Sequence, residues 1–213
     1  MIDVMTTAKV RMLGPVLLAG ALALALTALR LAGELDHWQP AWVFNTAPGG
    51  GGSPLGISWL VIPFGVWFGR RLARGGARPA NLGRTFLLHV LGIGLFVGLM
   101  AYVFNCVDDW RMKGMIASAG GAAIGLVACL AWPSAYFANL GAGILARIPV
   151  AAIQYFAVEG SWDVHFAKVQ PEVPKEDALF LLTSAQAGLW PFGYSVLLGG
   201  FFATLGAATV RKA

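Results

Sequence analysis

Long apolar stretches separated by short polar segments make up most of this chain. A helix that crosses the ~30 Å apolar core of a bilayer needs about 20 mostly apolar residues. Stretches near this length occur at about 13–31, 54–71, 85–107, 115–137, 144–160 and 190–210. The pattern therefore predicts an all-α, polytopic membrane protein whose single domain is a bundle of about six transmembrane helices.

The first stretch also resembles a signal peptide, because Lys9 and Arg11 precede it. Its apolar run is longer than the usual signal-peptide core of about 7 to 15 residues. Arg30 also stands where small residues would mark a cleavage site. We therefore expect the first stretch to stay in the protein as a span.

Composition supports a membrane protein over a soluble one. Of the 213 residues, 58% are hydrophobic and only 12% are charged. Soluble domains carry about a quarter charged residues, which cover their surface. This shortage of charge excludes an ordinary soluble domain.

The position of the charges predicts how the chain is oriented. If the N-terminus is cytoplasmic, the inner segments carry these basic residues: Lys9, Arg11, Arg70, Arg71, Arg74, Arg78, Arg84, Arg211 and Lys212. All acids except Asp3 then lie in outer segments. Loops retained in the cytoplasm are enriched in Lys and Arg. We therefore expect cytoplasmic termini in a plasma membrane of the bacterial inner-membrane type.

This topology also explains the net charge of +5. A basic balance in a soluble protein would suggest nucleic acid, but here the basic residues serve orientation and no nucleic-acid partner is expected. Clustered basic residues beside a span attract anionic lipid headgroups. We expect such contacts at Arg70, Arg71, Arg74 and Arg78.

The boundary between the fourth and fifth spans allows two interpretations. A turn at 132–133 divides the stretch evenly but places Arg147 near the middle of the membrane, where a charge is costly. A turn at 139–143 uses residues suited to turns and leaves Arg147 near the inner surface. We favour the turn at 139–143.

The segment before the last span predicts one more helix. Pro174, Glu176 and Asp177 suit the first turn of a helix. Trp190 and Pro191 favour an end before them. We expect an interfacial helix at about 174–188 on the outer face.

Small residues recur at every fourth position in several spans. They are Gly65 and Gly69, Gly94 and Gly98, Gly121 and Gly125, and then Ser195, Gly199, Ala203 and Ala207. This spacing places them on one helix face, where they allow close approach of a second helix. We expect most of these faces to pack inside the bundle, and the remainder to receive a partner membrane subunit or a second copy of the chain.

Few residues suggest chemistry. Four residues that could catalyse a reaction fall on the outer face: His37, Asp108, Asp163 and His165. Three of them, His37, Asp163 and His165, could also hold a metal ion. Their spacing matches no metal signature. Arg147 would become a site for an anionic ligand or lipid if it lay at mid-depth. The sequence identifies no cofactor.

Three functions follow from these patterns. The first is a non-catalytic subunit or accessory component of a membrane complex, favoured by the small-residue faces. The second is a small transporter or ligand-binding membrane protein, which requires a cavity between helices. The third is a membrane enzyme with an outer-face His/Asp site. We expect a protein that is not an enzyme.

Overall fold

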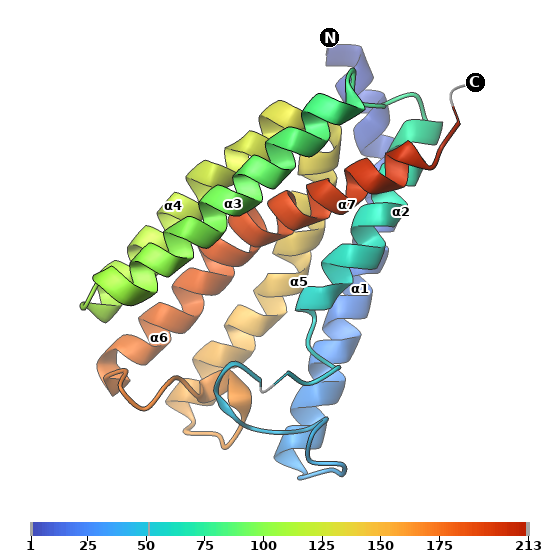
Figure 1. Cartoon of the computed structure of the whole chain (residues 1–213). Helices are drawn as coiled ribbons and strands as arrows, with labels where there is room; N and C mark the ends of the chain where they lie inside the picture. Colours follow the sequence, from blue (N-terminus) through green and yellow to red (C-terminus); the bar gives the residue numbers. More distant parts are fainter. Residues whose placement is uncertain (1, 51, 212–213) are drawn as a thin grey trace.

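The protein is built from helices that run alongside one another (Figure 1). The computed structural model describes residues 2–50 and 52–211, except for the side chains of 2–11 and Lys175, and contains no β-strand in these ranges. The α-helices are α1 (Ile2–Leu35), α2 (Val61–Arg74), α3 (Leu82–Cys106), α4 (Trp110–Ala131), α5 (Pro133–Glu159), α6 (Lys175–Ser184) and α7 (Val196–Ala208). The short elements are η1 (Pro48–Gly50), η2 (Ser58–Leu60), η3 (His165–Ala167) and the π-helix η4 (Ala185–Ser195).

Five helical segments of the described chain are long and apolar enough to cross a membrane. They are Met12–Leu35, Leu82–Cys106, Trp110–Ala131, Pro133–Glu159 and Glu176–Ala208. The start of α1 and the end of α7 lie at one end of the bundle, which we call the terminal end (Figure 1). Segments 36–50, 52–60, 107–109 and 160–174 lie at the opposite end, which we call the loop end. The predicted membrane protein is supported by these helices.

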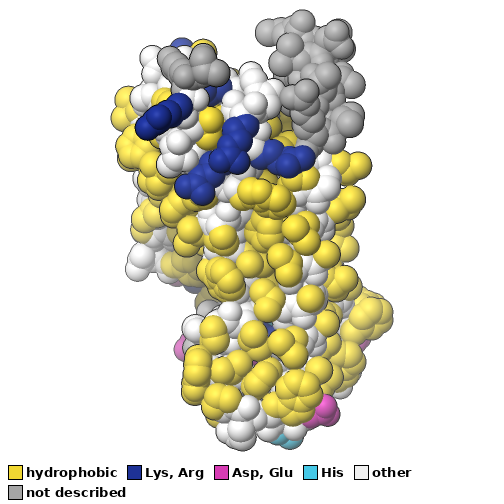
Figure 2. All heavy atoms as spheres, turned by 90° about the vertical axis from the view of Figure 1, so that its right-hand side faces the viewer, with side chains coloured by type: hydrophobic (Ala, Val, Ile, Leu, Met, Phe, Trp, Pro, Cys, Tyr) yellow, Lys and Arg dark blue, Asp and Glu magenta, His cyan; other side chains and the backbone are white. Residues whose placement is uncertain are grey.

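The surface is apolar between two charged ends. On the face in Figure 2, Lys and Arg side chains gather toward the terminal end, and acidic side chains and a histidine lie at the opposite end. This separation follows the charge pattern of the sequence. Lys212 and the side chains of Lys9 and Arg11 lie outside the described residues.

The second predicted span is shorter than expected. The stretch at 54–71 was expected to be helical throughout, but α2 is a 14-residue helix that begins at Val61. At 1.5 Å per residue it is about 21 Å long, which is less than a bilayer core. Ser53 does not cap a longer helix, because its hydroxyl donates to Val43 O and accepts from Leu55 N–H in a local turn.

The preferred position of the turn between the fourth and fifth spans was wrong. The chain turns at Trp132, and Pro133 occupies the first turn of α5, where its missing N–H costs nothing. Asn139 stays within the helix and donates to Ala135 O. Arg147 consequently lies in the middle of α5.

The predicted break before the last span is absent. Helical residues continue from α6 through η4 into α7, so the segment expected as a separate interfacial helix is the first part of the long helix Glu176–Ala208. Pro191 lies inside the π-helical segment. A π-helix changes the hydrogen-bond spacing, which lets the chain pass a residue that has no N–H to donate.

Small residues allow α2 and α7 to approach closely. A methyl group added to Gly69 would overlap the carbonyl oxygen of Ala203, and one added to Gly65 would lie 2.7 Å from Gly199 O. Gly94 and Gly98 have nothing within 4 Å of such a methyl group. The expected internal packing is thus present for α2 and α7, whereas this part of α3 faces outward.

Candidate functional site

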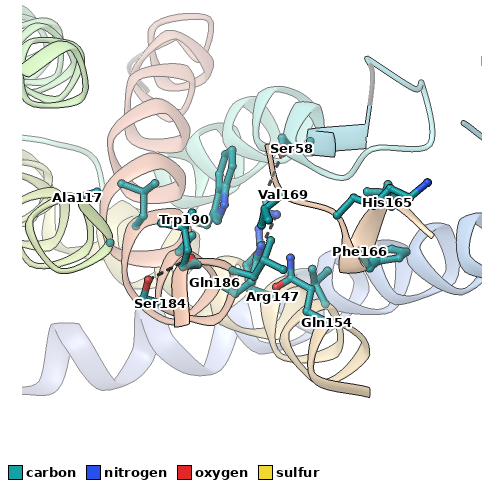
Figure 3. Close-up of a pocket in the computed structure, with 18 of the residues that line it drawn as sticks. Ser58, Ala117, Arg147, Gln154, His165, Phe166, Val169, Ser184, Gln186 and Trp190 are labelled. Atoms are coloured by element: carbon teal, nitrogen blue, oxygen red, sulfur yellow. Dashed lines mark hydrogen bonds between the residues drawn. The ribbon is translucent and has the colours of Figure 1, made fainter. Parts of the chain in front are cut away.

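A cavity of about 370 Å³ lies toward the loop end (Figure 3). Its wall includes residues of α4, α5, α6 and η4, together with residues from segments 49–58 and 165–170. Most of the lining is apolar, from side chains such as Ile57, Val150 and Leu189. This cavity is the feature that the transporter or ligand-binding hypothesis required.

Arg147 projects into this cavity from the middle of α5. Its side chain is only 8% exposed. The guanidinium donates to Gln186 Oε1 at 3.3 Å and to Ser58 Oγ at 3.0 Å, and it lies 4.3 Å from the centre of the Trp190 ring. Figure 3 shows these groups around it. All of its recorded contacts are therefore with neutral partners.

No acidic side chain of the described residues pairs with Arg147. The ion pairs recorded there are Arg30–Glu34, Arg111–Asp177, His165–Glu34 and Lys168–Asp163. A buried cation without a counter-charge is costly, and at membrane depth such a residue marks a functional site. An anion in the cavity would supply the missing charge.

Irregular backbone also reaches the cavity. Gly49, Leu55, Gly56 and Ile57 line it ahead of the short helix α2. Non-helical backbone at membrane depth occurs only where protein buries it or where it borders a cavity. Ser58 and the start of α2 present a helix N-terminus, whose partial positive charge also favours an anion.

Gln186 and Trp190 reach Arg147 from the π-helix η4. They stand four residues apart, on neighbouring turns of one helix. π-Helical segments often occur at functional sites, because the altered turn redirects side chains. The irregularity in the last helix thus contributes two of the three contacts to the guanidinium.

A second polar group lies beside the cavity, where the end of α1 meets η3. Glu34 is fully buried and accepts from Arg30 Nε at 2.6 Å. It also accepts from the backbone N–H of His165 at 2.9 Å, and His165 Nδ1 lies 2.6 Å from Glu34 Oε1. Arg30 donates in addition to the carbonyl oxygens of Asn45 and Gly50. The group joins α1 to two loop-end segments.

Burial lowers the pKa of His165 below its ordinary value, although Glu34 opposes this effect. The positive charge of Arg30 also lowers it, because it repels a protonated imidazole. A proton on His165 would therefore add an unbalanced charge to a buried group. His165 is neutral at pH 7 and donates from Nδ1 to the carboxylate.

The other predicted site residues lie apart from Arg147. Asp163 pairs with Lys168, which donates to its carboxylate and lowers its pKa. His37 is exposed in the turn that follows α1. Asp108 is exposed in the segment between α3 and α4. In the described part of the chain, no three His, Cys, Asp or Glu side chains lie close enough together to hold a metal ion.

The sequence reading missed several residues that line or support the cavity. They are Arg30, Glu34, Ser58, Gln186 and Trp190. One signal was available, because Arg30 and Glu34 stand four residues apart at the end of an apolar stretch, which is the spacing of an ion pair on one helix face. The contacts of Ser58 and Gln186 depend on tertiary structure, and no local pattern indicates them.

Comparisons with known protein families, curated proteins and solved structures give no significant match. The candidate site is therefore interpreted from its own geometry.

Proposed function

We propose that this protein is a multi-pass membrane protein that binds an amphipathic anion, with the anionic group at Arg147. The observation that carries the proposal is a buried arginine at the middle of α5 that lines a cavity and has no acidic partner among the described residues. Arginine suits phosphate and carboxylate groups, because its planar fork of N–H donors matches their oxygen atoms.

The apolar walls of the cavity indicate the chemistry of the rest of the ligand, beyond its anionic group. Small-molecule sites have volumes of about 300 to 1,000 Å³ and mostly apolar linings with a few polar groups. The cavity fits this description, with apolar side chains around Arg147 and the Trp190 ring stacked near the guanidinium. We infer a phosphate or carboxylate attached to an apolar body, as in an acidic lipid or a fatty acid.

For orientation, we propose cytoplasmic termini, so that the cavity lies toward the outer half of a plasma membrane. The Lys and Arg residues at the terminal end support this orientation. Anionic lipid is proposed to contact Arg70, Arg71 and Arg74 there. Arg78 donates to the carbonyl oxygens of Ala207 and Val210 at the end of α7, so it also serves as a cap.

Ligand retention tests the proposal. The wild-type protein, purified in mild detergent, should carry a phosphate- or carboxylate-bearing amphiphile that is detected by native mass spectrometry. Arg147→Gln should lose it, whereas the control Arg84→Gln should keep it, because Arg84 is exposed at the terminal end. Equal retention by wild type and Arg147→Gln would refute the assignment.

The thermal midpoint in detergent separates binding from folding. Arg147→Gln removes an unbalanced buried charge but also the hydrogen bonds to Ser58 and Gln186, so each protein is compared with its own midpoint without ligand. Added dodecyl phosphate should raise the midpoint of wild type, because a ligand that binds only the folded state stabilises it. The same addition should leave the midpoint of Arg147→Gln unchanged.

A further inference from the structure

Gln154 has a buried side-chain oxygen without a partner in the same cavity. The residue is 5% exposed, and its Oε1 accepts no hydrogen bond within the described residues. Gln154 stands seven residues after Arg147 on α5, which places both on one helix face about 10 Å apart along the axis. Figure 3 shows both among the residues that line the cavity.

The neighbouring polar groups do not satisfy this oxygen. Arg147 donates to Gln186 and Ser58, and the Ser118 hydroxyl donates to the carbonyl oxygen of Ser184. A buried acceptor that is left unpaired is costly. A donor on the ligand would remove this cost at the same time as its anion neutralises Arg147.

The charge of the lining decides between two kinds of donor. Arg30, Lys113, Arg147 and Lys168 line the cavity, and no Asp or Glu of the described residues does. Arg30 pairs with Glu34 and Lys168 with Asp163, so the charges of Lys113 and Arg147 are the ones that no acidic side chain of the described residues balances. An ammonium group would be repelled by this lining, whereas a neutral hydroxyl group would not. The donor that suits Gln154 is therefore a hydroxyl group.

We propose that the ligand carries a hydroxyl group beside its anion, and that Gln154 Oε1 accepts the hydrogen bond from this hydroxyl. The proposal rests on the proposed function, since it concerns the same cavity. A glycerol phosphate unit has the required chemistry, either as the headgroup of an acidic lipid or as the free ester. Gln154 then selects hydroxylated anions over simple ones.

Two matched lipids test this selection. Phosphatidylglycerol and phosphatidylpropanol have the same charge and carbon skeleton, and only phosphatidylglycerol has headgroup hydroxyl groups. We expect purified wild type to bind phosphatidylglycerol about tenfold more tightly by native mass spectrometry, which corresponds to one buried hydrogen bond. Free sn-glycerol 3-phosphate in a parallel titration distinguishes a soluble ligand from a lipid.

Gln154→Leu should bind both lipids equally, and the control Gln39→Leu, at an exposed loop position, should keep the wild-type preference. Equal binding of the two lipids by wild type would overturn the hydroxyl proposal and leave Arg147 as an anion site. This comparison uses wild type alone, so it does not depend on whether a variant folds. A preference retained by Gln154→Leu would also overturn it. No binding of either lipid or the free ester by wild type would overturn the hydroxyl proposal, and the dodecyl phosphate experiment decides separately whether Arg147 binds an anion.

Discussion

Glu34 holds His165 by two groups at once, the backbone N–H at 2.9 Å and the ring Nδ1 at 2.6 Å. Glu34 belongs to α1, and His165 begins the short helix η3. Phe166, Lys168 and Val169 follow His165 and line the cavity. This link therefore fixes one wall of the proposed ligand site to the end of a helix that is long and apolar enough to cross a membrane.

Removing the Glu34 carboxylate should destabilise the protein strongly. Glu34→Gln leaves Arg30 buried without its counter-charge, and breaking such a pair costs about 3 to 5 kcal/mol. The free energy of unfolding in detergent, measured by chemical denaturation, should fall accordingly. Asp163→Asn is the control, because that exposed pair with Lys168 should contribute little; equal losses in both variants would show that burial does not strengthen the Glu34 link.

Stability should decrease on mild acidification because of His165. Its folded pKa is lowered by burial, so the unfolded chain takes up a proton at a higher pH than the folded protein does. The stability that His165 contributes by staying neutral in the folded protein is complete above the ordinary histidine pKa of about 6.5. This stability is lost as the pH falls from there toward the pKa of His165 in the folded protein. Thermal midpoints from pH 8 to pH 5 should show this loss in wild type and a smaller one in His165→Asn. Parallel curves for the two proteins would contradict the assignment.

A methyl group at Gly69 should separate α2 from α7. Gly69→Ala forces overlap with Ala203 O, and overfilling a close contact costs about 1 to 3 kcal/mol. Gly94→Ala meets open space and should be neutral, or stabilising by up to about 1 kcal/mol, because alanine favours the helix. Thermal unfolding of the two variants compares them. A large loss in Gly94→Ala would indicate a contact with a partner subunit or a second copy.

The native cysteines allow a test of orientation. Cys106 is exposed at the end of α3 near the loop end, and Cys129 lies toward the opposite end of α4. In a Cys129→Ser background, a membrane-impermeant maleimide should label Cys106 on intact spheroplasts. Cys106→Ser should abolish the labelling. Labelling that requires permeabilised membranes would reverse the proposed topology.

The sequence predicted the helical class and the distribution of charge, because lipid exposure and loop charge are local properties of the chain. It misplaced the ends of helices near prolines, because a proline can begin, bend or end a helix. Pro133 was expected to lie within the fourth span and instead begins α5, whereas Pro191 was expected to lie beyond a helix end and instead lies within a π-helix.

The site was predicted less well for a related reason. The sequence analysis placed Arg147 near the inner surface, because a charge in the middle of the membrane without an acidic partner is costly. The same unpaired, buried charge now identifies Arg147 as the candidate anion site. The roles of Glu34 and Gln186 follow only from the distant residues that they contact, His165 and Arg147. Such contacts join residues more than 30 positions apart, so local spacing does not reveal them.

The short helix α2 gives the bundle an unequal cross-section. Toward the terminal end, α2 fills its place beside α7, but toward the loop end the same place is taken by the irregular chain that precedes Val61. Lengthening α2 by two turns toward the loop end would remove the irregular wall on which Ser58 meets Arg147. The space for a ligand therefore depends on a helix that starts late.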